Sequence, residues 1–189
     1  MIEDQYVDIT GQPSKLIHAL AAFDIVIENV WQDRANPMMY DAPILHYISH
    51  QMQHRTLTAS SCWVPFKAYY AQQTQSIDLG ICPLAVSALT HFYDAENDMI
   101  LIGKRSSHVL NHQQHYELVP SGTVDPSCAD QRRANLTQKI LEELEEEIAI
   151  HYNQVKQVTL LGCIADKTSH SMEFCFDIVL HSKSLKWRP

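Results

Sequence analysis

The stretch EELEEEIAI at residues 142–150 decides the fold, because it completes a helical pattern that begins well before it. Four aliphatic residues recur at every fourth position and form a single apolar stripe of an amphipathic helix: Leu136, Ile140, Leu144 and Ile148. We expect this helix to span residues 129–152. The stripe predicts that one dominant helix packs on the core of the domain, with Leu144 and Ile148 facing inward.

The same stretch concentrates negative charge, since it holds five of the ten glutamates of the chain. Glu143, Glu146 and Glu147 are spaced i, i+3 and i+4, so their side chains converge on one side of the helix. Like charges at this spacing repel, and the helix dipole disfavours acidic groups near the helix end. A hard divalent cation such as Mg²⁺ or Mn²⁺ would offset this repulsion, because it prefers carboxylate oxygens. A solvated polar face is the simpler alternative.

The composition limits the class of protein. The chain has 189 residues, 46% of them apolar, which suits one domain or one domain with an additional N-terminal element. The formal net charge is -8 and would be only -3 without the five clustered glutamates. Because basic residues are few and scattered, we exclude binding to duplex nucleic acid.

Several other classes are also disfavoured. The apolar stretch at residues 17–27 is interrupted by His18 and Asp24 and is too short to span a membrane, and no basic segment precedes it as in a secretory signal. The five cysteines include no C-x-x-C pair, which argues against a disulfide framework and a zinc ribbon. We therefore expect a cytoplasmic protein without a membrane partner. His46, His50 and His54 recur every four residues, but their neighbours read as strand or loop, which disfavours a zinc site.

The remaining pattern predicts strands, turns and short helices. We expect helices at residues 14–22 and 66–70, a linker at 76–83, and strands at residues 23–27, 44–49, 56–63, 84–92, 99–102, 116–119, 155–164 and 172–180. The strands at 84–92 and 99–102 should form a hairpin that ends at Gly103. This order predicts an α+β fold with a mixed sheet and one dominant helix. We expect residues 1–80 to form an N-terminal extension that packs on a main domain of residues 81–189.

Residues 82–181 resemble the Nudix hydrolase family. The helical stretch is similar to the Nudix box, G-x5-E-x7-R-E-U-x-E-E-x-G-U, with Glu143, Glu146 and Glu147 at the metal-binding glutamates and Leu144 and Ile150 at the aliphatic positions. The flanks agree: residues 101–106 (LIGKRS) look like the L-L-G-R-R-S strand of many members, and residues 117–122 (ELVPSG) resemble the E-L-x-P-x-G-G segment before the box.

The box also departs from the family pattern. Glu142 stands where the family has an arginine that orients a neighbouring glutamate, and Ala149 replaces the late glycine. Thr123 takes the second position of the glycine pair. The loop before the helix is longer than the standard spacing, so that Ala134 stands where that spacing would put the first glutamate.

The resemblance implies an α/β/α sandwich and a Mg²⁺- or Mn²⁺-dependent hydrolase that cleaves the diphosphate linkage of a nucleoside diphosphate derivative. It assigns metal binding to Glu143, Glu146, Glu147 and the carbonyl of Gly122, and catalysis to Glu143 and Glu146, with Glu146 as the base. Lys104 and Arg105 would contact phosphate; a solvated strand end is the alternative for this pair. The implied partner is a small nucleotide substrate.

The N-terminal residues suggest a substrate class. Residues 40–45 and 66–70 look like the start of a Nudix subgroup that acts on nucleotide sugars such as UDP-glucose. An extension that covers a sheet edge or makes a homodimer contact is the alternative. Related domains continue with a further strand and helix after residue 180, so we expect a domain truncated at its C-terminus or completed by another element.

Two other functions stay open. A catalytically silent Nudix-fold module that binds a nucleotide or a protein is consistent with Glu142 and Thr123. An isomerase of the same fold that acts on a prenyl diphosphate would need a catalytic cysteine, for which Cys82 and Cys128 offer no recognisable context.

Overall fold

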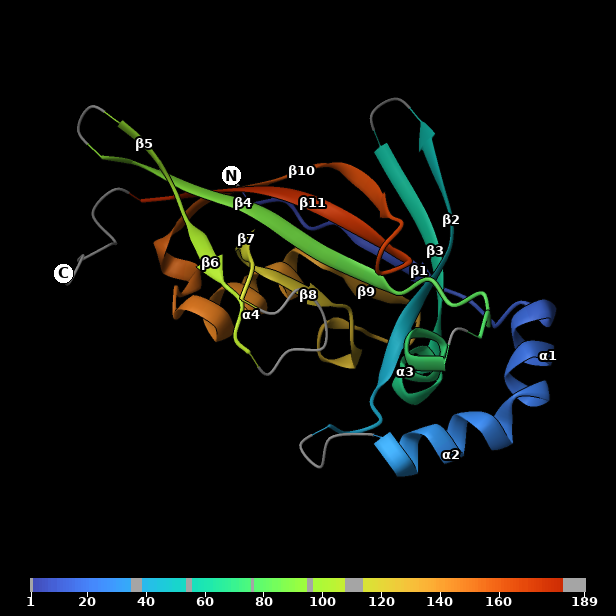
Figure 1. Ribbon diagram of the computed structural model, residues 1–189. Coiled ribbons are helices and arrows are strands. Elements are labelled where there is room, and N and C mark those ends of the chain that lie inside the picture. The colour runs from blue at the N-terminus through green and yellow to red at the C-terminus, as the bar shows by residue number, and fades with distance from the viewer. Residues whose placement is uncertain are drawn as a thin grey trace.

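The main sheet is mixed, as expected, and has five strands (Figure 1). The computed structural model describes residues 2–34, 39–53, 56–75, 77–94, 97–107 and 114–181. The sheet consists of β4 (Leu84–Asp94), β5 (Asn97–Ile100), β8 (Ser121–Thr123), β10 (Val155–Asp166) and β11 (Ser171–Leu180), in the order β10-β11-β4-β5 with β8 also paired to β4. The strands β11 and β4 are parallel, with Phe174 opposite Val86, and the other pairs are antiparallel.

A second sheet joins the N-terminal strands to the segment before the dominant helix. It has the order β2-β3-β1-β9 and consists of β1 (Tyr6–Ile9), β2 (Pro43–Gln53), β3 (Thr56–Pro65) and β9 (Arg133–Asn135). The predicted strands at 44–49 and 56–63 are confirmed as the antiparallel pair β2–β3. Because β1 pairs with β3 on one side and with β9 on the other, the first residues contact the segment directly before the dominant helix.

The predicted hairpin ends earlier than expected. Strand β5 stops at Ile100, and the next strand β6 (Ile102–Lys104) pairs with β7 (Tyr116–Leu118) instead of β4. The change of partner strand occurs at Leu101, whose N–H still donates a hydrogen bond to the carbonyl of Thr90 in β4. The residues after it therefore leave the main sheet and form a separate two-stranded ribbon.

The dominant helix α4 (Leu136–Ile148) is shorter than predicted. It begins late because the Asn135 side chain accepts the N–H of Gln138 at 3.0 Å and caps it, while Arg133–Asn135 are held in β9. It ends early because Ala149 adopts a left-handed conformation with φ 55 and ψ 35. An alanine thus adopts the left-handed (αL) conformation that glycine adopts most readily.

Three further helices lie at one end of the molecule: α1 (Ser14–Ala22), α2 (Asp24–Arg34) and α3 (Phe66–Gln75). The strand predicted at residues 23–27 is wrong, because Phe23 caps the end of α1 and residues 24–27 begin α2. Ile27 and Val30 are buried one turn apart, so tertiary packing outweighs the β propensity of the β-branched residues. Helix α1 is confirmed, and α3 extends five residues beyond the predicted helix at 66–70.

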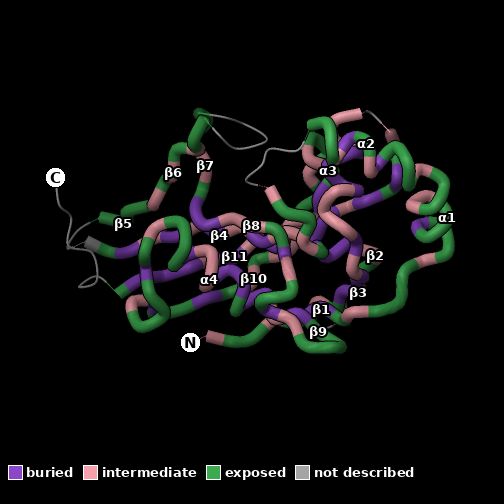
Figure 2. The backbone as a smooth tube through the Cα atoms, turned by 90° about the horizontal axis from the view of Figure 1, so that it is seen from below, coloured by how far each residue is buried: buried purple, intermediate pink, exposed green. Residues whose placement is uncertain are grey.

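Two apolar clusters hold these elements together (Figure 2). In the first, the predicted stripe is confirmed, since Leu136, Ile140 and Leu144 pack against β4 and β11 with at most 1% of their surface exposed. Burial of each such side chain stabilises the fold by about 1.5–3 kcal/mol. The second cluster lies among α1, α2, α3, β2 and β3 and includes Ile27, Tyr69 and Tyr70; the predicted linker contributes Leu79 and Ile81.

The N-terminal residues contribute to both clusters. Val7, Leu45 and Ala59 belong to the first one, together with the stripe of α4. Residues 1–80 thus have a core of their own and also pack on the rest of the chain; a domain boundary at residue 80 stays a prediction. None of the helices in the described residues has the length and apolar character needed to cross a membrane.

Candidate active site

The carboxylate of Glu143 lies against the backbone of β8. A Cβ placed on Gly122 would overlap the Glu143 carboxylate and approach its Cγ atom. Only a glycine at this position therefore leaves room for the carboxylate. The side chain of Glu143 is 13% exposed, so β8 and α4 hold it in a partly buried cradle. This contact joins two of the residues that the sequence pattern assigned to metal binding.

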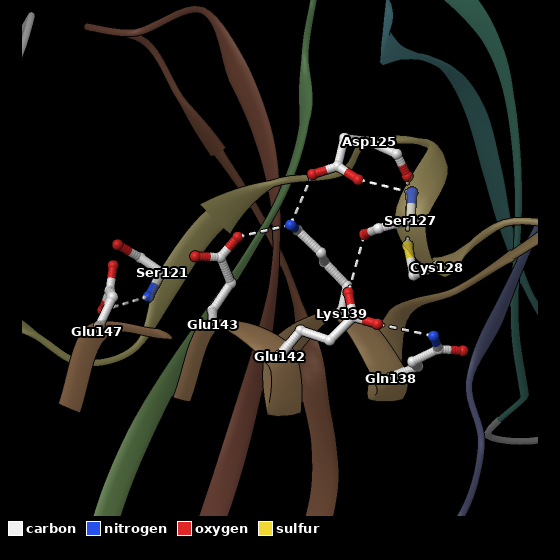
Figure 3. A network of polar contacts seen from close by, with 9 residues as sticks. All are labelled: Ser121, Asp125, Ser127, Cys128, Gln138, Lys139, Glu142, Glu143 and Glu147. Carbon is white, nitrogen blue, oxygen red and sulfur yellow. Dashed lines mark hydrogen bonds and ion pairs between the residues drawn. The ribbon is translucent and has the colours of Figure 1, made fainter. Parts of the chain in front are cut away.

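Lys139 is the cation that faces this cradle (Figure 3). Its Nζ lies 2.7 Å from Glu143 Oε1 and 2.7 Å from Asp125 Oδ2, and its side chain is 5% exposed. Burial alone would lower the pKa of Lys139, but the hydrogen bonds and charges of the two carboxylates outweigh it and hold this pKa above its usual range. The ammonium thus stays charged and neutralises part of the local negative charge.

A second set of contacts fixes the loop before the helix. Asp125 precedes the short 3₁₀ helix η1 (Pro126–Cys128), and its carboxylate accepts the N–H of Ser127 at 2.7 Å. Glu142 accepts hydrogen bonds from the Ser127 hydroxyl at 2.9 Å and from the Gln138 side chain at 2.7 Å. The glutamate that replaces the family arginine therefore ties α4 to η1 and does not contact Glu143 through any described hydrogen bond.

Glu147 lies beside the turn that leads into β8. Its carboxylate accepts the N–H of Ser121 at 3.3 Å, and although the residue as a whole is exposed, desolvation raises its pKa to about 7. The negative charges of Glu143 and Glu117 act in the same direction, and the positive charge of Arg105 acts against them. Burial is also the largest influence on Glu143 and raises its pKa, against the effect of Lys139.

Glu146 points to solvent on the same helix and is exposed. Its charge raises the pKa of Glu143, which places the two groups within electrostatic reach. Glu143 is thus linked electrostatically to Glu146 and to Glu147, but the described residues contain no group of three acidic, histidine or cysteine side chains placed closely enough to hold a metal ion. Their assignment as metal ligands stays a prediction.

The donors themselves suit a hard divalent cation. They are carboxylate oxygens, the Glu143 carboxylate packs directly on the backbone of Gly122, and desolvation and neighbouring negative charges disfavour the charged forms of Glu143 and Glu147. A bound cation would instead favour the charged form of these carboxylates. The ammonium of Lys139 already occupies one oxygen of Glu143, so the fit depends on the second oxygen and on Glu146 and Glu147.

A cleft of about 670 Å³ lies beside β8, and its lining includes Ser121 and Gly122 but none of the three glutamates. Its floor is formed by Ala85 and Ser87 of β4, which alternate with the buried Leu84, Val86 and Ala88 of the α4 core. Its rim includes β8, Tyr69 of the N-terminal extension, and two acidic residues at the end near β11: Ser121, Gly122, Thr123, Tyr69, Asp166 and Glu173. The extension therefore contributes one wall of the cleft.

Arg105 and Lys104 take different places at this cleft. Arg105 lines it and forms a 2.6 Å ion pair with Glu117, which also lines it. Lys104 is exposed, with its ammonium 5.8 Å from the centre of the Tyr116 ring. Arg105 thus lines the cleft and Lys104 does not, and a contact of either residue with phosphate stays a prediction. Of the histidines that recur every four residues, His46 is buried and accepts the N–H of Cys82 at 2.9 Å. His54 lies outside the described residues.

Sequence reasoning missed Lys139 and Asp125. The spacing of Lys139 and Glu143 at i and i+4 is a recognisable signal for an ion pair on a helix. Asp125 carried a weaker signal, as an acidic residue before Pro126 at the start of η1. Its contact with α4 depends on how the loop folds back.

Comparisons with known proteins find partial likenesses to solved structures only. No protein-family model matches the chain, and no curated protein sequence matches it. Among solved structures, NrtR of Shewanella oneidensis matches with 23% identity and a TM-score of 0.39 over 50% of this chain and 41% of that one. The NUDIX domain of the same NrtR, solved in complex with ADP ribose, matches with 20% identity and a TM-score of 0.40 over 57% and 65%.

A third match is RenU, a Nudix hydrolase from M. smegmatis, with 14% identity and a TM-score of 0.34 over 52% of this chain and 59% of that one. The chain thus spans less than two thirds of each of these structures. These three matches are thus NrtR, its NUDIX domain and a Nudix hydrolase.

Proposed function

We propose that this protein is a Nudix-type hydrolase that uses Mg²⁺ or Mn²⁺ to cleave the diphosphate linkage of a nucleoside diphosphate derivative, with a nucleotide sugar such as UDP-glucose as the substrate class. The observation that carries the proposal is the placement of Glu143 in the cradle of Gly122, with Glu147 at Ser121, beside a cleft that holds Arg105.

Different residues of the chain would take different roles in this hydrolysis. Arg105 presents a planar guanidinium suited to two phosphate oxygens, and its partner Glu117 keeps it in place at the rim. Glu143, Glu146, Glu147 and the carbonyl of Gly122 would hold the divalent cation. When bound, this cation neutralises diphosphate charge and favours attack by water. Glu146 is exposed and accepts the proton of that water as the general base.

The reaction is a hydrolysis and needs no other reactant. Water adds to one phosphorus, and the bridging P–O bond breaks. UDP-glucose would yield uridine monophosphate and glucose 1-phosphate. The nucleoside and the sugar would occupy the cleft between β8 and Tyr69, where hydroxyl and carboxylate groups can bond to sugar hydroxyls.

The experiment is a substrate panel assayed with Mg²⁺ and with Mn²⁺. It includes UDP-glucose, ADP-ribose and dinucleoside polyphosphates, and monophosphate release is measured by chromatography. We expect turnover that a chelator abolishes and that Glu146→Gln lowers by about a hundredfold or more. Lack of turnover on every compound by folded protein with metal would refute the proposal.

A second candidate function is a catalytically silent module of the same fold that binds a nucleotide. The 2.7 Å contact of Lys139 with Glu143 favours it, because an ammonium already neutralises one of the three carboxylates. Calorimetry distinguishes the two functions: nucleotide binding that is equally strong with and without Mg²⁺, in the absence of turnover, supports the silent module.

A further inference from the structure

Lys139 is unusual among the charged residues because it is almost fully buried next to the proposed metal ligands. Its side chain is 5% exposed, and its two carboxylate partners are 33% exposed for Asp125 and 13% for Glu143. A buried charge persists only where partners compensate its desolvation. Both partners lie at 2.7 Å, so Lys139 is the counter-ion that allows Glu143 to be charged in its cradle.

A divalent cation bound to Glu143 would have to share that carboxylate with the ammonium. Oxygen Oε1 already accepts a hydrogen bond from Lys139, and Gly122 leaves little space on the β8 side. Two positive centres on one carboxylate repel each other strongly in a partly buried site, where water screens them poorly. Metal binding therefore competes with an internal ion pair.

We propose that Lys139 is a built-in competitor of the divalent cation, and that its ion pair with Glu143 sets the metal affinity of the carboxylates on α4. The inference rests on the proposed function, since it concerns the same carboxylates. Its consequence is that the free protein is stable without metal, while the metal has to displace the ammonium from Glu143 or bind beside it.

The chain provides a matched control. Lys67 also lies between two carboxylates, at 2.9 Å from Glu28 Oε2 and 3.6 Å from Asp41 Oδ2, but it belongs to the N-terminal extension and its side chain is 28% exposed. Replacement of either lysine by methionine removes one positive charge and shortens the unbranched side chain by one atom. Only Lys139 faces the proposed metal ligands.

The test measures Mn²⁺ binding by electron paramagnetic resonance and calorimetry, without nucleotide. We expect Lys139→Met to bind Mn²⁺ roughly tenfold more tightly than the wild type or better, because a repelling charge is gone. Lys67→Met should bind Mn²⁺ like the wild type. Equal or weaker Mn²⁺ binding by folded Lys139→Met overturns the inference.

A measurement on the wild type covers the case in which Lys139→Met does not fold. A buried, doubly bonded ammonium exchanges its protons slowly and gives a resolved lysine Nζ signal in ¹⁵N NMR. We expect saturating Mg²⁺ to shift this signal or to speed its proton exchange, and to leave the Lys67 signal unchanged. An unchanged Lys139 signal at saturating Mg²⁺ contradicts the competition.

The outcomes separate the two proposals. If the wild type and Lys139→Met bind Mn²⁺ equally, the competition is wrong and the metal-dependent hydrolase stands. If neither binds Mn²⁺, the metal centre of the proposed function is wrong as well.

Discussion

The two lysine-centred ion clusters of this protein have the same composition and different surroundings. In each, one ammonium lies between two carboxylates: Lys139 between Asp125 and Glu143, and Lys67 between Glu28 and Asp41. The side chain of Lys139 is 5% exposed and that of Lys67 is 28% exposed. Water can therefore reach the side chain of Lys67, but it reaches that of Lys139 poorly.

This difference separates a surface contact from a structural one. Lys67 ties α3 to α2 at the surface of the extension, where screening by water limits the value of an ion pair. Lys139 ties α4 to the η1 loop and holds the glutamate that faces β8. The charge pattern alone cannot distinguish the two clusters, since burial decides how much each ion pair contributes to the free energy of unfolding.

The largest effect is expected from Lys139→Met. Removal of the ammonium leaves two carboxylates without their counter-ion in a partly buried site, so we expect the free energy of unfolding to fall by about 3 kcal/mol. Urea denaturation at neutral pH measures it. If the free energy of unfolding fell by less than about 1 kcal/mol, Lys139 would contribute no more than a surface ion pair, and the proposed difference from Lys67 would be wrong.

The next effect is expected from Gly122→Ala. The added methyl group overlaps the Glu143 carboxylate, so Glu143 has to leave its cradle and weaken its bond to Lys139. We expect a loss of about 1–2 kcal/mol in the free energy of unfolding and weaker Mn²⁺ binding. Gly11→Ala is the control, because no atom lies within 4 Å of a Cβ at that position. Equal stability of the two variants would show that the cradle does not constrain Glu143.

A smaller effect concerns pH and Glu147. Its pKa is raised from 4.5 to about 7 in the folded protein, so the folded state holds a proton that the unfolded state has released between these values. Its contribution to stability is present below pH 4.5 and is lost as the pH rises to about 7. We expect Glu147→Gln to be more stable than the wild type at pH 7.5 and to lose this advantage at pH 4. Thermal unfolding at both pH values measures it, and an identical difference at both would contradict the shift.

The smallest effect is expected from Lys67→Met. Its pair with Glu28 is solvent-accessible, and surface pairs contribute about 0–1 kcal/mol. Urea denaturation under the conditions used for Lys139→Met gives the direct comparison. A loss as large as that of Lys139→Met would show that the extension depends on its ion cluster as strongly as α4 depends on Lys139.

The helix and its packing could be predicted from the sequence because periodicity reports directly on burial. The positions of Leu136, Ile140 and Leu144 predicted the buried face, and the same phase placed the glutamates on the other side. The helix start could not be predicted, because Asn135 becomes a cap only after β9 pairs with β1. The strand predicted at 23–27 failed for a similar reason, since packing on the second cluster outweighs local propensity.

The candidate site was predictable only in part. The spacing of Glu143, Glu146 and Glu147 predicted repulsion between neighbouring carboxylates, and the charge of Glu146 does raise the pKa of Glu143, as the charge of Glu143 raises that of Glu147. The contact with Asp125 could not be predicted, because it joins residues 14 positions apart through a loop. The i, i+4 spacing of Lys139 and Glu143 was a signal for their ion pair, but it could not show that Lys139 is buried.

The most direct test of the central claim is the rate of nucleoside monophosphate release from UDP-glucose and ADP-ribose, with and without Mg²⁺, by the wild type and by Glu146→Gln. We predict metal-dependent release by the wild type, at a rate that Glu146→Gln lowers by about a hundredfold or more while Lys67→Met leaves it unchanged. Release that proceeds at the full rate in Glu146→Gln, or no release from any nucleotide by folded wild-type protein with Mg²⁺, would contradict the account.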